Sequence, residues 1–146
     1  MKMTAKKLLV LLLALVMTFA LAACGKKDAS TDAGKVTLPV ADGATIGTGA
    51  TAITVEVQSG DGKSITFTVN TDEETVGAAL LMLGDVSGED SQYGLYVKSV
   101  NAETADYDVD GTYWAFYVNG EYAMASVDAY TPEAGTTYDF HVENGA

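Results

Sequence analysis

The sequence has no arginine, one cysteine and one histidine, and these scarcities exclude several kinds of site. A single cysteine cannot form an intrachain disulfide, and a single histidine, His141, cannot supply a histidine cluster for a metal ion. There is no glycine-rich phosphate loop of the P-loop or dinucleotide type. The longest apolar run is also shorter than the roughly 20 residues that a membrane-spanning helix needs. A packed core must therefore form from apolar side chains alone.

Basic residues are also few, and acidic ones dominate. All 20 acidic residues follow Cys24, whereas three of the eight lysines precede it. From Cys24 onward, five lysines stand against those 20 acids, which gives a side-chain charge of −15. Nucleic acids and anionic lipid headgroups are bound through Lys and Arg, so neither is an expected partner of this surface.

The N-terminus has the pattern of an export signal. Three lysines precede an apolar run of 16 residues, Leu8 to Ala23. The run ends in L-A-A-C-G at residues 21–25, which resembles a bacterial lipobox. We therefore predict a lipoprotein signal peptide at 1–23 and a lipid on Cys24 that anchors the protein to the outer face of the cell membrane. The alternative is a plain signal peptide with an incidental cysteine.

Composition divides the rest of the chain into two parts. Residues 24–50 are rich in Gly, Ala, Ser, Thr and Asp and lack periodicity, which predicts a flexible tether. Residues 51–146 suffice for one small domain. Alternating apolar residues predict strands at 52–58 and 64–70, and an apolar stripe predicts a helix from Val76 to Leu83. Residues 85–92 read as an acidic loop, and further strands are predicted at 93–100, 113–118, 121–124 and 137–142. The predicted fold is α+β, with a β-grasp-like mixed sheet of about five strands and one short helix.

The strongest local signal is a hairpin at Asn119-Gly120, a dipeptide typical of a type I′ turn. Strand alternation places Trp114 and Phe116 on one face, which we assign to the helix side as structural residues. The opposite face carries tyrosines and a methionine, side chains that are enriched where proteins bind ligands. Either this face is open, or the tether, the acidic loop or a neighbouring domain covers it. The candidate ligand-binding residues are Tyr113, Tyr117, Tyr122, Met124 and Tyr96.

The same segment carries a family resemblance. Residues 105–124, A-D-Y-D-V-D-G-T-Y-W-A-F-Y-V-N-G-E-Y-A-M, resemble the transcobalamin-like C-terminal domain family, as do Val127-Asp128 and the G-x-x-Y-x-F ending at 135–140. The likeness spans about 95 residues, and Ser126 departs from it where the family has glycine. The resemblance implies a β-grasp module that binds a small ligand, with cobalamin or a related corrinoid as ligand rather than as catalytic cofactor.

Two further patterns are weaker. The pattern D-x-D-x-D-G formed by Asp106, Asp108 and Asp110 matches the start of an EF-hand calcium loop. The twelfth position of such a loop needs a glutamate, and here it is Tyr117. They form either a solvated acidic turn or a weak calcium site. No pair of carboxylates lies in an apolar setting of the kind that glycosidases use, so we expect no enzymatic activity. The sequence thus predicts a lipid-anchored extracytoplasmic module for a small ligand. The alternative is a structural or adhesive module that docks another protein through the tyrosine face.

The lipid anchor is tested by Cys24→Ser. This substitution removes the thiol that accepts the lipid, so the precursor should stay uncleaved at this site and should lose its label in cells fed with radioactive palmitate. Unchanged labelling would contradict the lipobox prediction.

Overall fold

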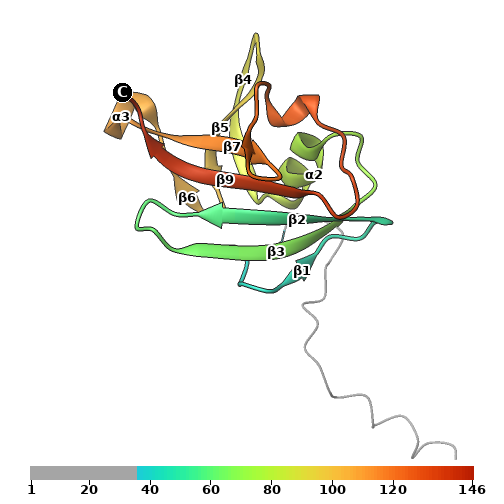
Figure 1. Ribbon diagram of the computed structural model, residues 1–146. Coiled ribbons are helices and arrows are strands. Elements are labelled where there is room, and N and C mark those ends of the chain that lie inside the picture. The colour runs from blue at the N-terminus through green and yellow to red at the C-terminus, as the bar shows by residue number, and fades with distance from the viewer. Residues whose placement is uncertain (1–35) are drawn as a thin grey trace, which may run out of the picture. The chain divides into compact units, whose positions relative to one another are not determined.

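The described part of the chain forms two sheets (Figure 1). The computed structural model describes residues 36–146, and these contain nine strands. The elements in chain order are β1 (Thr45–Ile46), β2 (Thr51–Gln58), β3 (Ser64–Thr71), α2 (Val76–Leu83), β4 (Val86–Ser91), β5 (Gly94–Val100), β6 (Glu103–Thr104), α3 (Tyr107–Asp110), β7 (Thr112–Val118), β8 (Glu121–Tyr122), a 3₁₀ turn (Val127–Ala129) and β9 (Thr137–Asn144). No helix among them is long and apolar enough to cross a membrane.

The last strand lies in the middle of the larger sheet. That sheet has the order β1–β3–β2–β9–β7–β8, and the smaller sheet has the order β4–β5–β6. β9 runs parallel to β2, with Val55 beside Tyr138, and antiparallel to β7, with Phe116 beside Phe140. A parallel pair requires a long crossover. The whole chain between β2 and β9 supplies it, so the helix, the smaller sheet and the β7–β8 hairpin are all enclosed in one connection.

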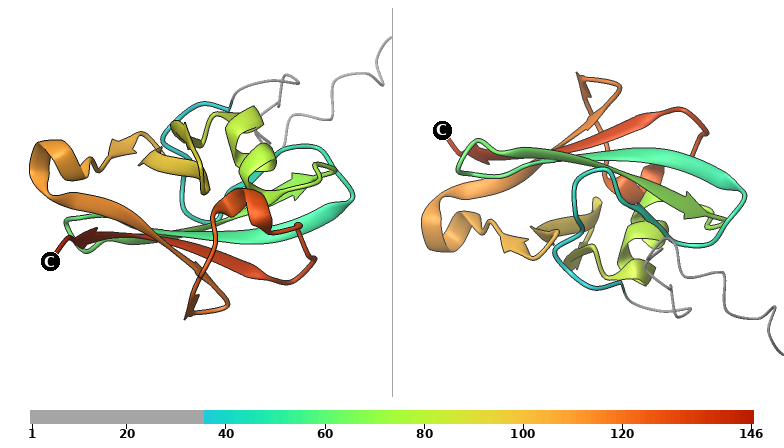
Figure 2. Two further views of the ribbon diagram at one scale, coloured as in Figure 1. Left: turned by 90° about the horizontal axis from the view of Figure 1, so that it is seen from above. Right: turned by 90° about the horizontal axis from the view of Figure 1, so that it is seen from below.

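One face of the larger sheet carries the core. Val55, Val69 and Phe140 are completely or almost completely buried on that face, because alternate residues of each strand point the same way. α2 and the smaller sheet cover them from the same side (Figure 2). Leu80 of α2 and Val100 of β5 are buried in the same cluster. The core is therefore a sheet packed against a mixed layer of one helix and three short strands.

The helix and the two hairpins agree with the sequence. The hydroxyl of Thr75 accepts a hydrogen bond from the backbone N–H of Ala78 at 3.0 Å, and Gly84 ends α2 in the left-handed conformation. β2 and β3 pair over their full length. In the β7–β8 turn, Asn119 and Gly120 have φ values of 50° and 80°, as a type I′ turn requires.

The number of strands and sheets corrects the β-grasp-like prediction. The fold is sheet-rich, but nine strands in two sheets replace about five in one. The main correction is β4, which occupies the predicted acidic loop at 85–92. Only Val86 of β4 is buried, so the strand has no apolar alternation to reveal it, and pairing with β5 stabilises it instead. β8 is also shorter than predicted, since its paired residues end at Tyr122.

Residues 36–50 differ from a tether. Ile46 of β1 is buried beside Val69, and Val40 is buried at 5 % exposure. The side-chain amide of Asn101 holds the backbone of Val40 by accepting from its N–H at 2.5 Å and donating to its carbonyl at 3.3 Å. The ordered domain therefore begins before residue 51. Residues 24–35 of the predicted tether, the signal peptide and Cys24 lie outside the described residues.

Asp85 is a buried carboxylate at the junction of α2 and β4. Its exposed fraction is 1 %, and neither carboxylate oxygen has a hydrogen-bond partner within residues 36–146. Burial disfavours the charged form and raises the pKa of Asp85 from 3.8 to about 7. The ionised carboxylate is therefore a source of instability at neutral pH.

The pH dependence of stability tests this environment. A carboxyl with a raised pKa in the folded state stabilises the fold fully below its unfolded pKa of 3.8, and this contribution is lost as the pH rises through about 7. Asp85→Asn keeps the shape but removes the charge, so it should be more stable than wild type at pH 8 by about 2–4 kcal/mol. The difference should shrink towards pH 4. Denaturant unfolding of both proteins measures it, and a constant difference between pH 4 and pH 8 would contradict the assignment.

Candidate functional site

The predicted tyrosine face is split between two places. Tyr113 and Tyr117 lie on the outer face of β7, opposite the core. Both hydroxyls donate to the carboxylate of Glu143 on β9, that of Tyr113 at 3.1 Å. The ring of Tyr117 lies 4.6 Å from that of His141 and meets Tyr122 edge-on at 5.4 Å. We call these five residues the outer tyrosine network.

The hydroxyls of Tyr113 and Tyr117 are satisfied by the carboxylate of Glu143. The hydrogen bond to Glu143 is the main reason why the pKa of Tyr117 is raised to about 12. The corresponding bond raises the pKa of Tyr113 as well. Asp139 lies on the same face and is 6 % exposed. Burial and then the charge of Glu56 raise the pKa of Asp139, and its Oδ1 has no hydrogen-bond partner in the described chain. This face thus holds two tyrosine hydroxyls paired with Glu143 beside one desolvated carboxylate.

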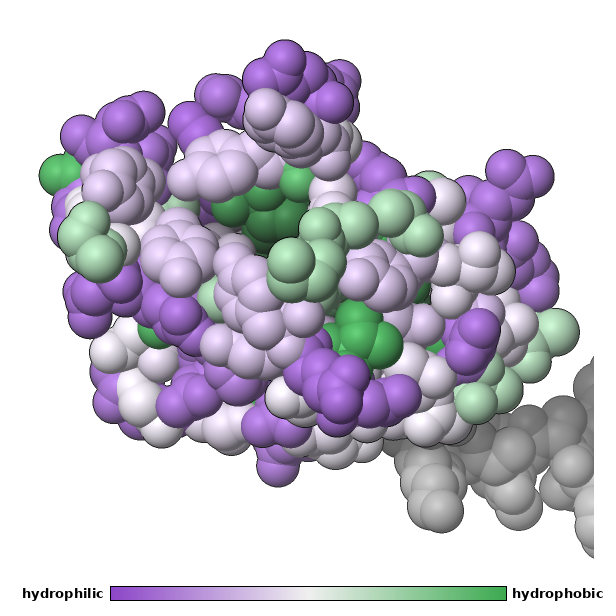
Figure 3. Space-filling model, turned by 45° about the horizontal axis from the view of Figure 1, so that its top comes forward, coloured by the Kyte–Doolittle hydropathy of each residue, from purple (hydrophilic) through white to green (hydrophobic). Residues whose placement is uncertain are grey.

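A cleft opens on the other side of β7, where the β4–β5 hairpin faces the segment after β8. Its volume is about 600 Å³. Figure 3 shows a hollow with a hydrophobic floor and less hydrophobic surroundings. We call it the aromatic cleft. The residues that line it are Ser91, Tyr93, Gly94, Leu95, Tyr96, Val97, Trp114, Phe116, Tyr122, Ala123, Met124, Ala125, Ser126 and Val127.

Trp114 and Phe116 belong both to the core and to this cleft. Trp114 is 7 % exposed, and Phe116 packs against the core cluster. The Phe116 ring contacts three neighbours, Tyr130 at 5.5 Å, Phe140 at 5.1 Å and Tyr138 at 6.2 Å between ring centroids. Because aromatic pairs favour fixed relative orientations, these contacts hold Phe116 in place. The cleft therefore has a rigid apolar floor.

Two hydrogen bonds tie one wall of the cleft to the other. The hydroxyl of Ser126 donates to the carbonyl of Leu95 at 3.0 Å, and the N–H of Leu95 donates to Oδ2 of Asp128 at 2.8 Å. Gly94 allows this approach, because it has a φ of 100° and a Cβ there would lie 2.7 Å from Cβ of Ser126. The hydroxyl of Ser126 therefore helps to fix the hairpin.

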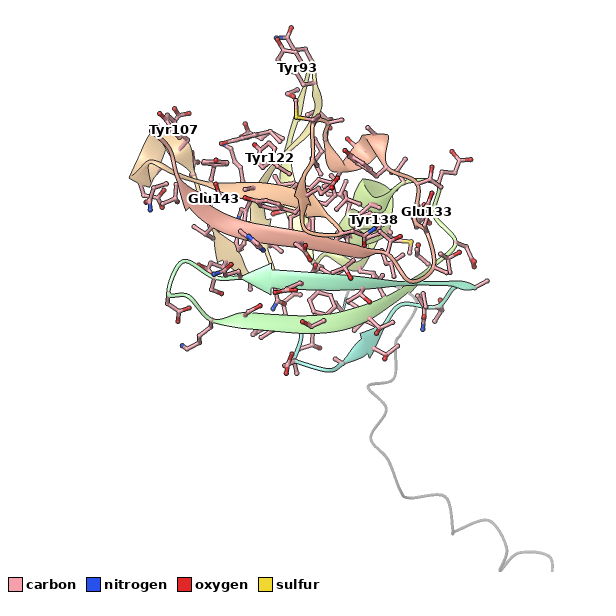
Figure 4. The ribbon with its side chains drawn as sticks, viewed as in Figure 1. Tyr93, Tyr107, Tyr122, Glu133, Tyr138 and Glu143 are labelled. Carbon is pink, nitrogen blue, oxygen red and sulfur yellow. The ribbon has the colours of Figure 1, made fainter. Side chains whose placement is uncertain are left out.

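The rim of the cleft is exposed and aromatic. Tyr93 lies at the tip of the β4–β5 hairpin (Figure 4) and is 82 % exposed. Met124 is 92 % exposed. Tyr96 and Tyr122 are exposed to a lesser degree. Large apolar side chains are seldom gathered in the open on a soluble domain unless they contact something. The rim is therefore a candidate contact surface.

The predicted residues divide accordingly. Tyr96 and Met124 line the cleft, and Tyr113 and Tyr117 face away from it. Tyr122 belongs to both places, because it borders the cleft and its ring meets that of Tyr117. The sequence assigns Trp114 and Phe116 to structure alone and misses Tyr93, although the run Tyr93-Gly94-Leu95-Tyr96-Val97 could have suggested it. Alternation reveals which face a side chain takes, but it does not reveal where the layer above that face has a gap.

Two of the three aspartates of the calcium-like pattern bond to other groups of the chain. Asp106 caps α3 by accepting from the N–H of Asp108 at 3.1 Å and lies 3.4 Å from Nζ of Lys98. Asp110 accepts from the N–H of Thr112 at 2.9 Å. Within residues 36–146, no group of three or more His, Cys, Asp or Glu side chains is arranged to hold a metal ion.

Comparison with known proteins identifies relatives. Residues 73–144 match the family described as "Domain of unknown function (DUF4430)". A solved structure from Ruminococcus gnavus ATCC 29149, described as a "putative metal binding protein", is 31 % identical with a TM-score of 0.62, and the match covers 66 % of this chain and 100 % of that one. The structure of haptocorrin in complex with Cbi has 17 % sequence identity to this chain and a TM-score of 0.48, and the match covers 66 % of this chain and 25 % of haptocorrin. No curated protein matches.

The tie between the walls is tested by Gly94→Ala with Gly62→Ala as its control. Both glycines have positive φ, but a Cβ at Gly62 would meet no atom within 4 Å. Each variant should lose about 1–2 kcal/mol from the backbone conformation, and Gly94→Ala should lose about 1–3 kcal/mol more because Ser126 must move. Denaturant unfolding measures both losses. Equal losses would mean that the hairpin is not held against Ser126.

Proposed function

The chain belongs to the same protein family as the Ruminococcus gnavus protein, and on this premise we propose that it is a small-ligand-binding module with the aromatic cleft as its site. The observation that carries the proposal is the combination of a rigid apolar floor and an exposed aromatic rim. The proposed role is binding without catalysis. It is exercised outside the cell by a protein anchored through a lipid on Cys24.

The size and construction of the cleft support this role. Ligand pockets in proteins measure about 300–1,000 Å³ and are mostly apolar and largely pre-formed. The aromatic cleft, at about 600 Å³, lies within this range. Its floor is fixed by the aromatic contacts of Phe116, and its walls are fixed by the hydrogen bonds of Leu95. Little ordering would therefore be needed on binding, which favours affinity.

A corrinoid such as cobalamin is the first ligand to test, because the segment 105–124 resembles transcobalamin-like domains. A metal ion is the second ligand to test, because the Ruminococcus gnavus protein is described as a metal binding protein. The lining of the cleft is mostly aromatic and aliphatic and includes no carboxylate, imidazole or thiolate side chain, which favours an organic molecule.

The alternative function is docking of another protein through the outer tyrosine network. The exposed Tyr122 and Met124 could contribute to either role. However, the hydroxyls of Tyr113 and Tyr117 are already bonded to Glu143, so that face has few free donors for a partner. The cleft has the larger uncovered aromatic surface, and we favour it for this reason.

Titration of the full chain tests the proposal. Trp114 is the only tryptophan and lines the cleft, so its emission reports on that site directly. Cobalamin and the neutral apolar dye Nile red are the probes, with equilibrium dialysis to correct for the absorbance of cobalamin. We expect saturable binding that weakens about 10-fold or more in Tyr93→Ala/Tyr96→Ala, since buried aromatic residues dominate most binding sites.

Tyr107→Ala provides the matched control. Tyr107 is 50 % exposed on α3 and does not line the cleft, so this variant should bind like wild type. Equal binding by both variants would place the ligand elsewhere. A protein that binds Nile red but not cobalamin would still have the cleft as its ligand site, but a corrinoid would be excluded as the ligand. If Tyr113→Ala/Tyr117→Ala were the only variant to lose binding of both cobalamin and Nile red, the outer tyrosine network would be the favoured site.

A further inference from the structure

The lining of the aromatic cleft has an unusual charge composition for a protein with so many ionisable residues. None of the side chains that line it is charged. Five are aromatic and one is methionine, and these are the groups whose electron-rich surfaces attract cations. The aromatic residues are Tyr93, Tyr96, Tyr122, Trp114 and Phe116.

Of the four charged residues that are next to a lining residue along the chain, three are acidic and one is Lys98. Asp90 precedes the lining residue Ser91, Glu121 precedes Tyr122, and both acids are exposed. Asp128 lies at the back wall through its bond to Leu95. The protein as a whole has 20 acidic residues and eight lysines, so these three carboxylates add to a field that is negative overall.

Among residues 36–146, Lys98 is the lysine next to the lining along the chain, and its charge is balanced by carboxylates. Nζ of Lys98 lies 3.2 Å from Glu89 and 3.4 Å from Asp106, so two carboxylates balance one ammonium group. The same Nζ lies over the ring of Tyr96, 6.0 Å from its centroid. Tyr96 therefore already receives a cation at its face, at the distance where such attraction becomes effective.

We propose that the aromatic cleft selects organic cations with apolar substituents, of the quaternary ammonium class, over neutral and anionic molecules of the same shape. The inference rests on the proposed function, because it names the class of ligand that the same cleft takes. The ring faces supply the attraction, and the surrounding carboxylates enrich cations at the mouth and repel anions. A quaternary ammonium group suits such a site because it has no N–H donors to leave unsatisfied against an apolar floor.

A pair of probes with equal shape separates charge from size. Choline and its neutral analogue 3,3-dimethylbutan-1-ol differ in the replacement of N⁺ by carbon. Binding of each to the full chain is followed by Trp114 emission and by ligand-observed NMR, with acetate as the anionic comparison. Choline should bind about 3- to 30-fold more tightly than the alcohol, which is the range of cation–π stabilisation. Its affinity should fall between 20 mM and 500 mM salt, whereas that of the alcohol should not.

Two variants identify the source of the preference. Tyr96→Leu keeps an apolar side chain but removes the ring, so it should reduce the choline preference and leave the affinity of the alcohol nearly unchanged. Glu121→Gln removes one exposed acid, so it should lower the choline affinity about 2-fold at low salt only. If Tyr96→Leu does not fold, the salt dependence of the wild-type protein still decides between attraction by charge and simple burial.

The outcomes separate this inference from the proposed function. Equal affinities for choline and the alcohol, or no binding of choline to a protein that binds Nile red, would overturn the cation preference and leave the cleft as a ligand site. A protein that binds neither Nile red, nor cobalamin, nor choline would overturn both.

Discussion

The position of β9 is the constraint on which the rest of the domain depends. β9 is the last strand of the chain, yet it lies between β2 and β7 and supplies their only direct connection within the described sheet. Its inward side chains Tyr138 and Phe140 are buried at 2 % and 0 % exposure. Phe140 contacts Phe116, and so the same strand that closes the sheet also sets the floor of the aromatic cleft.

The cleft is a consequence of how the second layer covers this sheet. α2 has only eight residues, and the smaller sheet pairs its strands with one another rather than with the larger sheet. The β4–β5 hairpin is held close to its turn by the hydrogen bonds of Leu95 with Ser126 and Asp128, while Tyr93 in the turn is exposed. The gap that remains exposes the edge of the core, and core residues thereby become binding-site residues.

Much of the framework could be predicted because its signals are local. The alternation of apolar residues reveals β2 and β3. Thr75 and Gly84 mark the start and the end of α2, and Asn119-Gly120 defines the β7–β8 turn. β4 could not be predicted in this way, because its exposed residues carry no apolar pattern and its stability comes from pairing with β5. The packing of residues 36–50 depends on contacts distant in sequence, such as that between Val40 and Asn101, 61 residues apart.

The site shows the same division. The face taken by Trp114 and by Tyr117 follows from strand alternation, but the cleft arises from a gap in the covering layer, which only the tertiary structure reveals. Amide chemical shifts of the isotopically labelled full chain, recorded during titration with a probe such as Nile red, show where a ligand binds. If the aromatic cleft is the site, the largest changes occur at residues 91–97 and 122–127, on the two walls of the cleft. Changes confined to Tyr113, His141 and Glu143 on the outer face would contradict this assignment.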